Sequence, residues 1–244
     1  MKFFNFKTSD IGIDLGTANV LIYRRGEGVI LNQPSVVAVD RQTGKVLAVG
    51  ESAYAMIGRT SKNIELIRPL KEGVIADFDI TSEMLRMFLS KLEIGGLFSF
   101  SQPRILICCP TNITTVEKDA IKKVAEKCGA KKVYIEEEPK VAAVGAGLSI
   151  FEPLGNMVID IGGGTTDIAV LSMGDIVNSA SLKIAGDVLT NDIIDYVKNE
   201  YKLLIGLRMA EEIKIKIGVV HNPDPSNTLE IKGRDLVSGL PKKI

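Results

Sequence analysis

Two aspartates, Asp14 and Asp160, each end an apolar strand-like run and are followed by a hydrophobic residue and a glycine-containing tip. The first run reads Ile11-Gly-Ile-Asp14-Leu-Gly16-Thr17, and the second reads Val158-Ile-Asp160-Ile-Gly162-Gly-Gly-Thr165. A glycine tip lets backbone N–H groups point outward and form a nest that binds anions. An aspartate at the strand end cannot bind phosphate, but it can hold Mg²⁺ through the water shell of the ion. Two such hairpins facing one another would clamp a polyphosphate with the metal between them.

The same hairpins have a simpler interpretation, in which their Asp and Gly residues only serve ordinary turns. A single glycine motif is weak evidence, since such motifs often occur without a ligand. Here the same order of aspartate, hydrophobic residue and glycine occurs at both points where an α/β pattern begins. This repetition favours phosphate binding over two unrelated turns.

The periodicity of apolar residues predicts the elements that position these aspartates. Strands are expected at 11–24 with a break at 16–17, and at 28–31, 35–40, 45–49, 104–109, 133–135, 157–161, 167–172 and 228–232, with a further strand that reaches Ala185. Helices are expected from a cap at Thr81 or Ser82, from a capping box at 114–117 to Cys128, and at 141–148, 187–201 and 208–217. The order of strands and helices predicts an α/β fold with a mostly parallel sheet, and the pattern restarts after Gly155.

The composition excludes several classes of function. Lysine plus arginine and aspartate plus glutamate number 30 each, so no basic field favours nucleic acid as a partner. The only histidine, His221, argues against a His-rich metal site and a Ser-His-Asp triad. The 3 cysteines fit neither a disulfide framework nor zinc spacing, which favours a reducing compartment. Because the sequence has no apolar run of roughly 18 residues and no signal peptide, we expect a cytoplasmic protein.

The two hairpins resemble the phosphate motifs of a known superfamily. Asp14-Leu-Gly-Thr-Ala-Asn19 and Asp160-Ile-Gly-Gly-Gly-Thr-Thr-Asp167 are similar to those of actin, Hsp70 and sugar kinases. Three further runs resemble the MreB/Mbl family of bacterial actins, namely Asn32-Gln-Pro-Ser-Val-Val-Ala, Ile67-Arg-Pro-Leu-Lys-Glu-Gly-Val-Ile-Ala-Asp77 and Glu136-Glu-Glu-Pro-Lys-Val-Ala-Ala143. The last of these is most similar to the Mbl branch. The resemblance extends from about Asp10 to the last residue.

This resemblance implies an actin-like fold, in which an RNase H-like unit is duplicated to form two lobes around a nucleotide cleft. The first lobe would span residues 1–148, as a core subdomain IA with a small subdomain IB inserted at about 32–75. Residues 149–244 would form the second lobe, a partial subdomain IIA with subdomain IIB. Family members continue beyond Ile244, so we expect the C-terminal part, with a third glycine-rich loop against the adenine, to be missing and nucleotide binding to be weak.

The family also implies where ATP and Mg²⁺ would bind. Asp14 and Asp160 fall at its magnesium-associated carboxylates. The phosphate loops would be Thr17, Ala18 and Asn19, and Gly162, Gly163 and Gly164, and a helix contacting the adenosine would supply Glu211, Glu212 and Lys214. From the residues alone, Glu211 and Lys214 would be an ordinary solvated salt bridge with i, i+3 spacing.

An acidic run, Glu136-Glu137-Glu138-Pro139, lies where a buried strand is expected to enter a helix. Hydrolysis of a nucleotide needs a group that orients or deprotonates a water in line with the γ-phosphate. Acidic residues at a helix N-terminus also simply complement the helix dipole. In the MreB/Mbl family the glutamate before the proline faces the attacking water, which implies Glu138 as the catalytic residue. Glu137 remains a possible partner or substitute.

Two apolar segments suggest a contact with a membrane. Phe3, Phe4 and Phe6 lie between lysines near the N-terminus, and Gly95-Gly-Leu-Phe-Ser-Phe100 reads as an apolar loop. Exposed aromatic residues beside lysines suit a lipid interface. A disordered start and a buried loop anchor are the alternatives. The resemblance favours peripheral binding to the inner face of the plasma membrane, through Phe3, Phe4, Leu97 and Phe98.

The MreB/Mbl resemblance implies a cell-shape-determining cytoskeletal protein. ATP would drive its self-association into membrane-associated filaments that organise the cell-wall elongation machinery, with slow ATP hydrolysis coupled to polymerisation. An Hsp70-type chaperone domain and a small-molecule kinase share the superfamily fold. A chaperone would need a peptide-binding domain after the nucleotide lobe, and a kinase would need a sugar pocket and a base beyond the glutamates already assigned. We therefore expect the cytoskeletal function.

Overall fold

The computed structural model describes residues 10–92, 94, 102–224 and 226–244. The chain forms two compact units, Met1–Lys183 and Ile184–Ile244, and each is described by itself. The loop expected to bind a membrane and the N-terminal phenylalanines lie outside the described residues.

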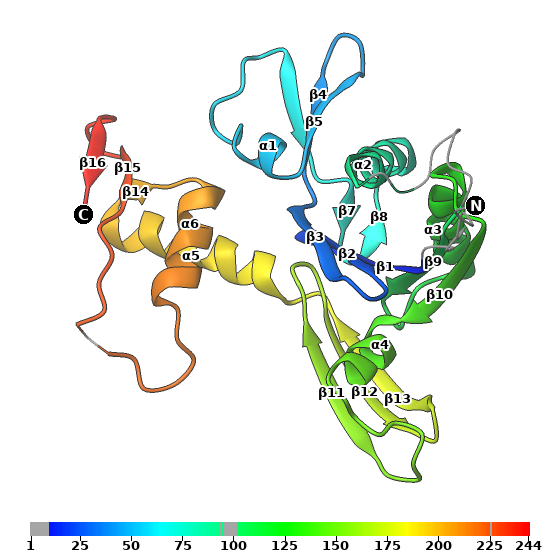
Figure 1. The fold of residues 1–244 in the computed structure, drawn as a ribbon. Helices are drawn as coiled ribbons and strands as arrows, with labels where there is room; N and C mark the ends of the chain where they lie inside the picture. Colours follow the sequence, from blue (N-terminus) through cyan, green and yellow to red (C-terminus); the bar gives the residue numbers. More distant parts are fainter. Residues whose placement is uncertain (1–9, 93, 95–101, 225) are drawn as a thin grey trace. The chain divides into compact units, whose positions relative to one another are not determined.

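A five-stranded sheet organises the first unit (Figure 1). In spatial order it contains β10 (Lys132–Glu137), β9 (Arg104–Cys109), β1 (Asp10–Leu15), β2 (Asn19–Arg24) and β3 (Gly28–Pro34). The strands β1, β9 and β10 run parallel, whereas β1, β2 and β3 are antiparallel neighbours. The expectation of a mostly parallel sheet is therefore wrong. Short turns join β1 to β2 and β2 to β3, and a short turn only permits antiparallel pairing.

Two helices, α2 (Phe78–Lys91) and α3 (Thr115–Lys127), supply apolar side chains to the main core, which they form with this sheet. The capping box predicted for α3 is confirmed, because Thr114 and Glu117 cap each other's backbone N–H. The predicted start of α2 is wrong. Its cap is Asp77, whose carboxylate accepts a hydrogen bond from the N–H of Ile80 at 3.0 Å. Thr81 lies one turn inside the helix, where its hydroxyl donates back to the carbonyl of Asp77 at 2.6 Å.

Residues 37–75 add smaller elements that the apolar pattern only partly predicted. The strands predicted at 35–40 and 45–49 are confirmed as β4 (Val37–Asp40) and β5 (Val46–Val49), which pair as a hairpin. The strand β6 (Ile64–Ile67) pairs with β4 to complete a three-stranded sheet. A short helix, α1 (Glu51–Tyr54), packs against this sheet. The chain then makes a minimal hairpin of β7 (Leu70–Lys71) and β8 (Val74–Ile75).

A second antiparallel sheet follows helix α4 (Glu138–Gly145) and repeats the start of the first. It contains β11 (Asn156–Ile161), β12 (Thr166–Ser172) and β13 (Asp175–Leu182) in chain order. The strand β11 carries Asp160 as its penultimate residue, and β1 carries Asp14 as its penultimate residue. The structure thus places the two aspartates at equivalent positions of two similar hairpins. Helix α4 packs on β11 and β12.

The second unit contains two helices and a small sheet. Its elements are α5 (Gly186–Tyr201), β14 (Leu203–Leu204), α6 (Leu207–Ile217), β15 (Lys232–Asp235) and β16 (Pro241–Lys243). The predicted strand at 228–232 is wrong, because β15 begins only at Lys232. The Asp235 carboxylate accepts hydrogen bonds from the N–H groups of Val237 and Ser238, which sets a turn after Asp235 and the pairing of β15 with β16. None of the described helices is long and apolar enough to cross a membrane.

Candidate functional site

Four acidic side chains converge at the ends of the hairpins in the first unit. Asp14 is the penultimate residue of β1, Glu138 begins α4 directly after β10, and Asp160 is the penultimate residue of β11. Asp167 lies on β12, where it is the register partner of Asp160. Because β1, β9 and β10 are parallel, their carboxyl ends meet at one edge of the sheet, which brings Glu138 to Asp14. We call Asp14, Glu138, Asp160 and Asp167 the carboxylate cluster.

The carboxyl groups of the cluster shift one another's pKa values. Burial, the charges of Asp14, Asp160 and Asp167, and a hydrogen bond to Asp14 together raise the pKa of Glu138 to about 8, and burial contributes most. Burial and the charge of Asp160 raise the pKa of Asp14 to about 6, against the hydrogen bond with Glu138. Glu138 therefore keeps its proton at neutral pH and donates a hydrogen bond to Asp14 with it. Burial and Asp167 also raise the pKa of Asp160. The cluster binds protons strongly, and it would bind a cation for the same reason.

Asp167 is a member of the cluster that the sequence analysis did not assign. Only 1% of its surface is exposed, and the Thr111 hydroxyl lies 3.3 Å from its Oδ1. Asp167 shares the buried face of its strand with Ala169 and Leu171, in alternation with the less buried residues between them. A charged residue in an inward position of a strand costs free energy unless it is hydrogen-bonded and paired or binds a cation, so it marks a candidate site. That alternation was the signal in the sequence that could have identified it.

The two predicted phosphate loops lie against each other. A methyl group built on Gly163 would lie 2.6 Å from Cβ of Ala18, and one on Gly164 would lie 2.8 Å from Oγ1 of Thr17. Since real Cβ atoms do not approach so closely, only glycine fits at these two positions. The Ser35 hydroxyl holds the start of the first loop in place, because it donates a hydrogen bond to the carbonyl of Gly16 at 2.6 Å.

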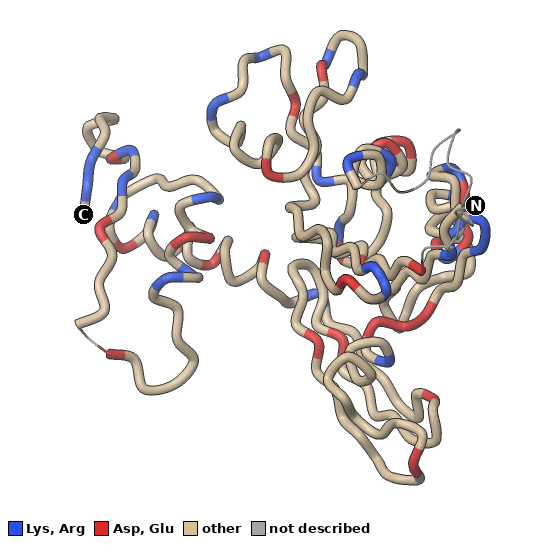
Figure 2. The backbone as a smooth tube through the Cα atoms, viewed as in Figure 1, with Lys and Arg blue, Asp and Glu red and all other residues tan. Residues whose placement is uncertain are grey.

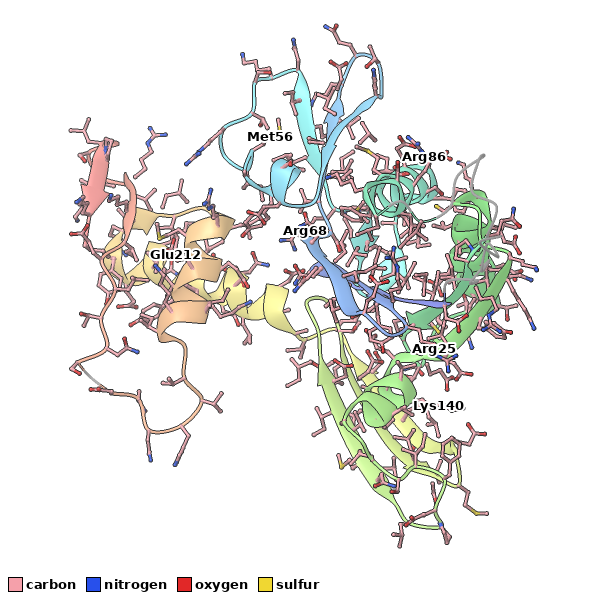
Figure 3. The ribbon with its side chains drawn as sticks, in the orientation of Figure 1. Arg25, Met56, Arg68, Arg86, Lys140 and Glu212 are labelled. Carbon is pink, nitrogen blue, oxygen red and sulfur yellow. The ribbon has the colours of Figure 1, made fainter. Side chains whose placement is uncertain are left out.

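The other glutamates of the acidic run lie beside the cluster without joining it. In Figure 2 the run is a stretch of the tube coloured red for Asp and Glu, where β10 leads into α4. Glu136 pairs with Lys140 at 3.5 Å, and Figure 3 labels Lys140 on α4. Glu137 ends β10, where it is the register partner of Cys109 on β9. Glu138 is thus the member of the run that hydrogen-bonds within the carboxylate cluster.

The residues expected to contact the adenosine lie on α6 in the second unit. Glu211 and Lys214 form the expected i, i+3 ion pair at 2.7 Å, but both are partly buried. The Thr190 hydroxyl, on α5, lies 2.6 Å from Oε2 of Glu211 and accepts a hydrogen bond from Lys214 at 3.0 Å. Glu212, labelled in Figure 3, pairs instead with Lys216 at 2.6 Å. Glu211 and Lys214 therefore join a network with α5, and Glu212 does not.

The cluster suits a cation that keeps its water shell. Among the described residues, no three His, Cys, Asp or Glu side chains are placed to ligate a metal ion directly. Mg²⁺ dehydrates reluctantly and is usually held by one or two carboxylates together with water and phosphate oxygens. Asp14 and Asp160, beside two loops of glycine and threonine, fit that mode of binding.

Two similar β-hairpins, each delivering an aspartate beside a glycine-containing loop, define an actin-like fold, and solved structures support this class. The crystal structure of MreB5 of Spiroplasma citri bound to ADP superposes with a TM-score of 0.90 at 43% identity, over 98% of this chain and 71% of that one. The MreB5 structure bound to AMPPNP matches equally well. The MamK double helical filament matches with a TM-score of 0.77 at 19% identity, over 97% of this chain and 72% of that chain, which supports the fold alone.

Sequence comparison gives the family. The model of the MreB/Mbl protein family matches residues 8–244, and the chain belongs to this family. It is 65% identical to the cell shape-determining protein Mbl of Bacillus cereus over 235 residues, which cover 96% of this chain and 70% of the relative. It is 46% identical to the cell shape-determining protein MreB of Escherichia coli K12 over 245 residues, which cover 99% of this chain and 70% of the relative. The predicted family and fold class are confirmed, and the chaperone and kinase alternatives receive no support.

Proposed function

We propose that this chain is a cell-shape-determining, actin-like protein that binds ATP with Mg²⁺ and assembles into filaments. The observation that carries the proposal is the pair of equivalent aspartates, Asp14 and Asp160, beside loops that touch at Gly163 and Ala18. Relatives named as cell shape-determining proteins support the cellular role. The MreB5 structures bound to ADP and AMPPNP support the choice of nucleotide.

Each part of the site has a task in this proposal. Backbone N–H groups of Thr17, Ala18 and Asn19, and of Gly163 and Gly164, would bind the phosphate oxygens. The N–H of Gly162 instead donates to the carbonyl of Thr165 at 2.9 Å, which would hold the second loop in shape. Asp14 and Asp160 would hold Mg²⁺ through water, and the bound ion would neutralise phosphate charge. On the second unit, the partly buried pair of Glu211 and Lys214 would contact the adenosine, together with Glu212 of the same helix.

Glu138 would orient the attacking water, which makes the protein a slow ATPase. The role requires its ionised form, because only a carboxylate accepts a hydrogen bond from water on both oxygens. Glu137 is the weaker candidate, since Glu138 is the residue that hydrogen-bonds to Asp14.

The remaining assignments complete the proposal. The lobes would be 1–148, with an insertion at about 32–75, and 149–244, and self-association would build the filament. The protein would act in the cytoplasm, where Phe3, Phe4, Leu97 and Phe98 would hold filaments on the inner membrane face beside the cell-wall elongation machinery. Aromatic side chains of this kind partition to the lipid interface.

The decisive experiment compares wild type with Asp160→Asn and Glu138→Ala. We expect wild type to bind a fluorescent ATP analogue with Mg²⁺ and to form filaments visible by electron microscopy. Asp160→Asn should lose at least tenfold in Mg²⁺-dependent affinity, because it removes a charge from the metal side of the site. Glu138→Ala should keep binding and lose most phosphate release. Failure of wild type to bind ATP, or unchanged phosphate release by Glu138→Ala, would contradict the proposal.

A further inference from the structure

The turn between β7 and β8, formed by Glu72 and Gly73, touches both phosphate loops. The N–H of Gly73 donates a hydrogen bond to Oγ1 of Thr17 in the first loop, at 3.0 Å. A methyl group on Gly164, in the second loop, would lie 3.0 Å from the N and Cα atoms of Glu72. One on Gly73 would lie 3.4 Å from Cγ2 of Thr165. The turn therefore packs against both loops with little spare room.

An ion pair fastens this turn to the second hairpin sheet. Nζ of Lys183, the residue after β13, lies 2.5 Å from Oε2 of Glu72. The hydrogen bond to Glu72 raises the pKa of Lys183. The side chains are 73% exposed for Lys183 and 54% exposed for Glu72, so water and salt screen the pair. Such a pair can form and break readily, unlike a buried one.

The backbone of the turn indicates that the Glu72 side chain has a role of its own. Both turn residues have positive φ, 49° for Glu72 and 78° for Gly73, and they join the paired residues Lys71 and Val74. This is the geometry of a type I′ turn, whose first position favours Asn, Asp or Gly. A glutamate there costs conformational energy, because its Cβ crowds the backbone. Strain of this kind is retained where the side chain serves a site.

We propose that the Glu72–Gly73 turn is a clasp over the phosphate loops, held closed by the ion pair between Glu72 and Lys183. The N–H of Gly73 occupies an acceptor position of the Thr17 hydroxyl, so the hydroxyl hydrogen is left to donate elsewhere. Gly73 is thus a positioning residue that aims Thr17 at a phosphate oxygen. Opening of the clasp would loosen both loops and let the phosphates of a nucleotide exchange. This ligand assignment rests on the proposed ATP binding.

The test uses one variant that removes the ion pair of the clasp and also relieves the backbone strain at position 72. Glu72→Asn removes the carboxylate and places a favoured residue in the type I′ turn. Met173→Asn is the matched control, because Met173 has φ 52° and precedes Gly174 in a similar turn between β12 and β13. Hydrogen–deuterium exchange of the amides at 17–19 and 162–165 reports on the loops without any nucleotide. The dissociation rate of a fluorescent ATP analogue reports on exchange.

We expect Glu72→Asn to raise amide exchange at both loops about two- to fivefold, as loss of an exposed ion pair implies. Added salt should have the same effect on wild type and little effect on the variant. The melting temperature should not fall, and Met173→Asn should leave loop exchange unchanged. Exchanging the charges, with Glu72→Lys and Lys183→Glu together, should restore protection. If the amides of both loops exchange in Glu72→Asn at the same rate as in wild type, the clasp proposal is overturned. Absence of ATP binding by wild type would overturn the proposed function. The amide exchange is measured without nucleotide, so it would still test whether the clasp holds the loops.

Discussion

Replacing Glu138 with glutamine should stabilise the protein at high pH. Glutamine resembles the neutral form of the side chain, which the folded chain prefers, and its amide can still donate to Asp14. A carboxyl whose pKa is higher in the folded chain than in the unfolded chain binds its proton more tightly when folded. Stability from Glu138 is therefore greatest below its ordinary pKa of 4.5, and it is lost as the pH rises toward the folded value of about 8.

The magnitude follows from the same values. A tenfold change in proton affinity corresponds to 1.36 kcal/mol, so raising the pKa from 4.5 to about 8 is worth about 5 kcal/mol. Part of this shift belongs to the pair and not to Glu138 alone, since Asp14 and Glu138 interact and titrate together. We expect Glu138→Gln to be about 2–4 kcal/mol more stable than wild type at about pH 9, and nearly equal to it at about pH 4.5.

Urea unfolding without nucleotide, followed by circular dichroism between about pH 4.5 and pH 9, measures this difference directly. Glu136→Gln is the control, because Glu136 pairs with Lys140 at the surface and should show no gain in stability with pH. The reasoning fails if wild type does not lose stability across this range. It also fails if Glu138→Gln is no more stable than wild type at the upper end.

Three further perturbations test other parts of the structure. Gly163→Ala should reduce nucleotide affinity at least tenfold in a fluorescence titration, because its methyl group would lie 2.6 Å from Cβ of Ala18, whereas Gly145→Ala enters open space and should bind normally. Burial is the main reason that the pKa of the Cys108 thiol is raised to about 12. The thiol should therefore react slowly with iodoacetamide at about pH 8 in the folded chain and rapidly in urea. Fast labelling of the folded chain would contradict that burial. Thr114→Ala removes the capping box of α3 and should cost about 1 kcal/mol in thermal unfolding, with an unchanged melting temperature as the contrary result.

The sequence predicted the parts of the site that depend on local patterns. Asp14 and Asp160 were found because each lies in a short, repeated run, and both indeed occupy the penultimate position of a strand. The capping box at Thr114 and the strand 104–109 were found for the same reason. What these features share is that their cause lies within a few neighbouring residues.

The parts that failed depend on residues far apart in the chain. That Glu138 hydrogen-bonds to Asp14 follows from parallel pairing of β1, β9 and β10, which no local pattern contains. Asp167 was missed because its burial depends on packing around the hairpin. The start of helix α2 is a local exception to this, since it begins at Phe78 because Asp77 caps it, although Thr81 also had the composition of a cap. Side-chain chemistry alone could not choose between those candidates.

The alternation of β1 has a consequence for how the family can change over time. Ile11, Ile13 and Leu15 point into the core, while Asp14 lies on the other face of the strand. Apolar residues of similar volume exchange in a core at modest cost, so the inward positions are free to drift among Val, Ile and Leu. Insertion of one residue before Asp14 would send its carboxylate into the apolar interior. Lineages should therefore accumulate substitutions on the inner face of this strand and reject single-residue insertions or deletions within it.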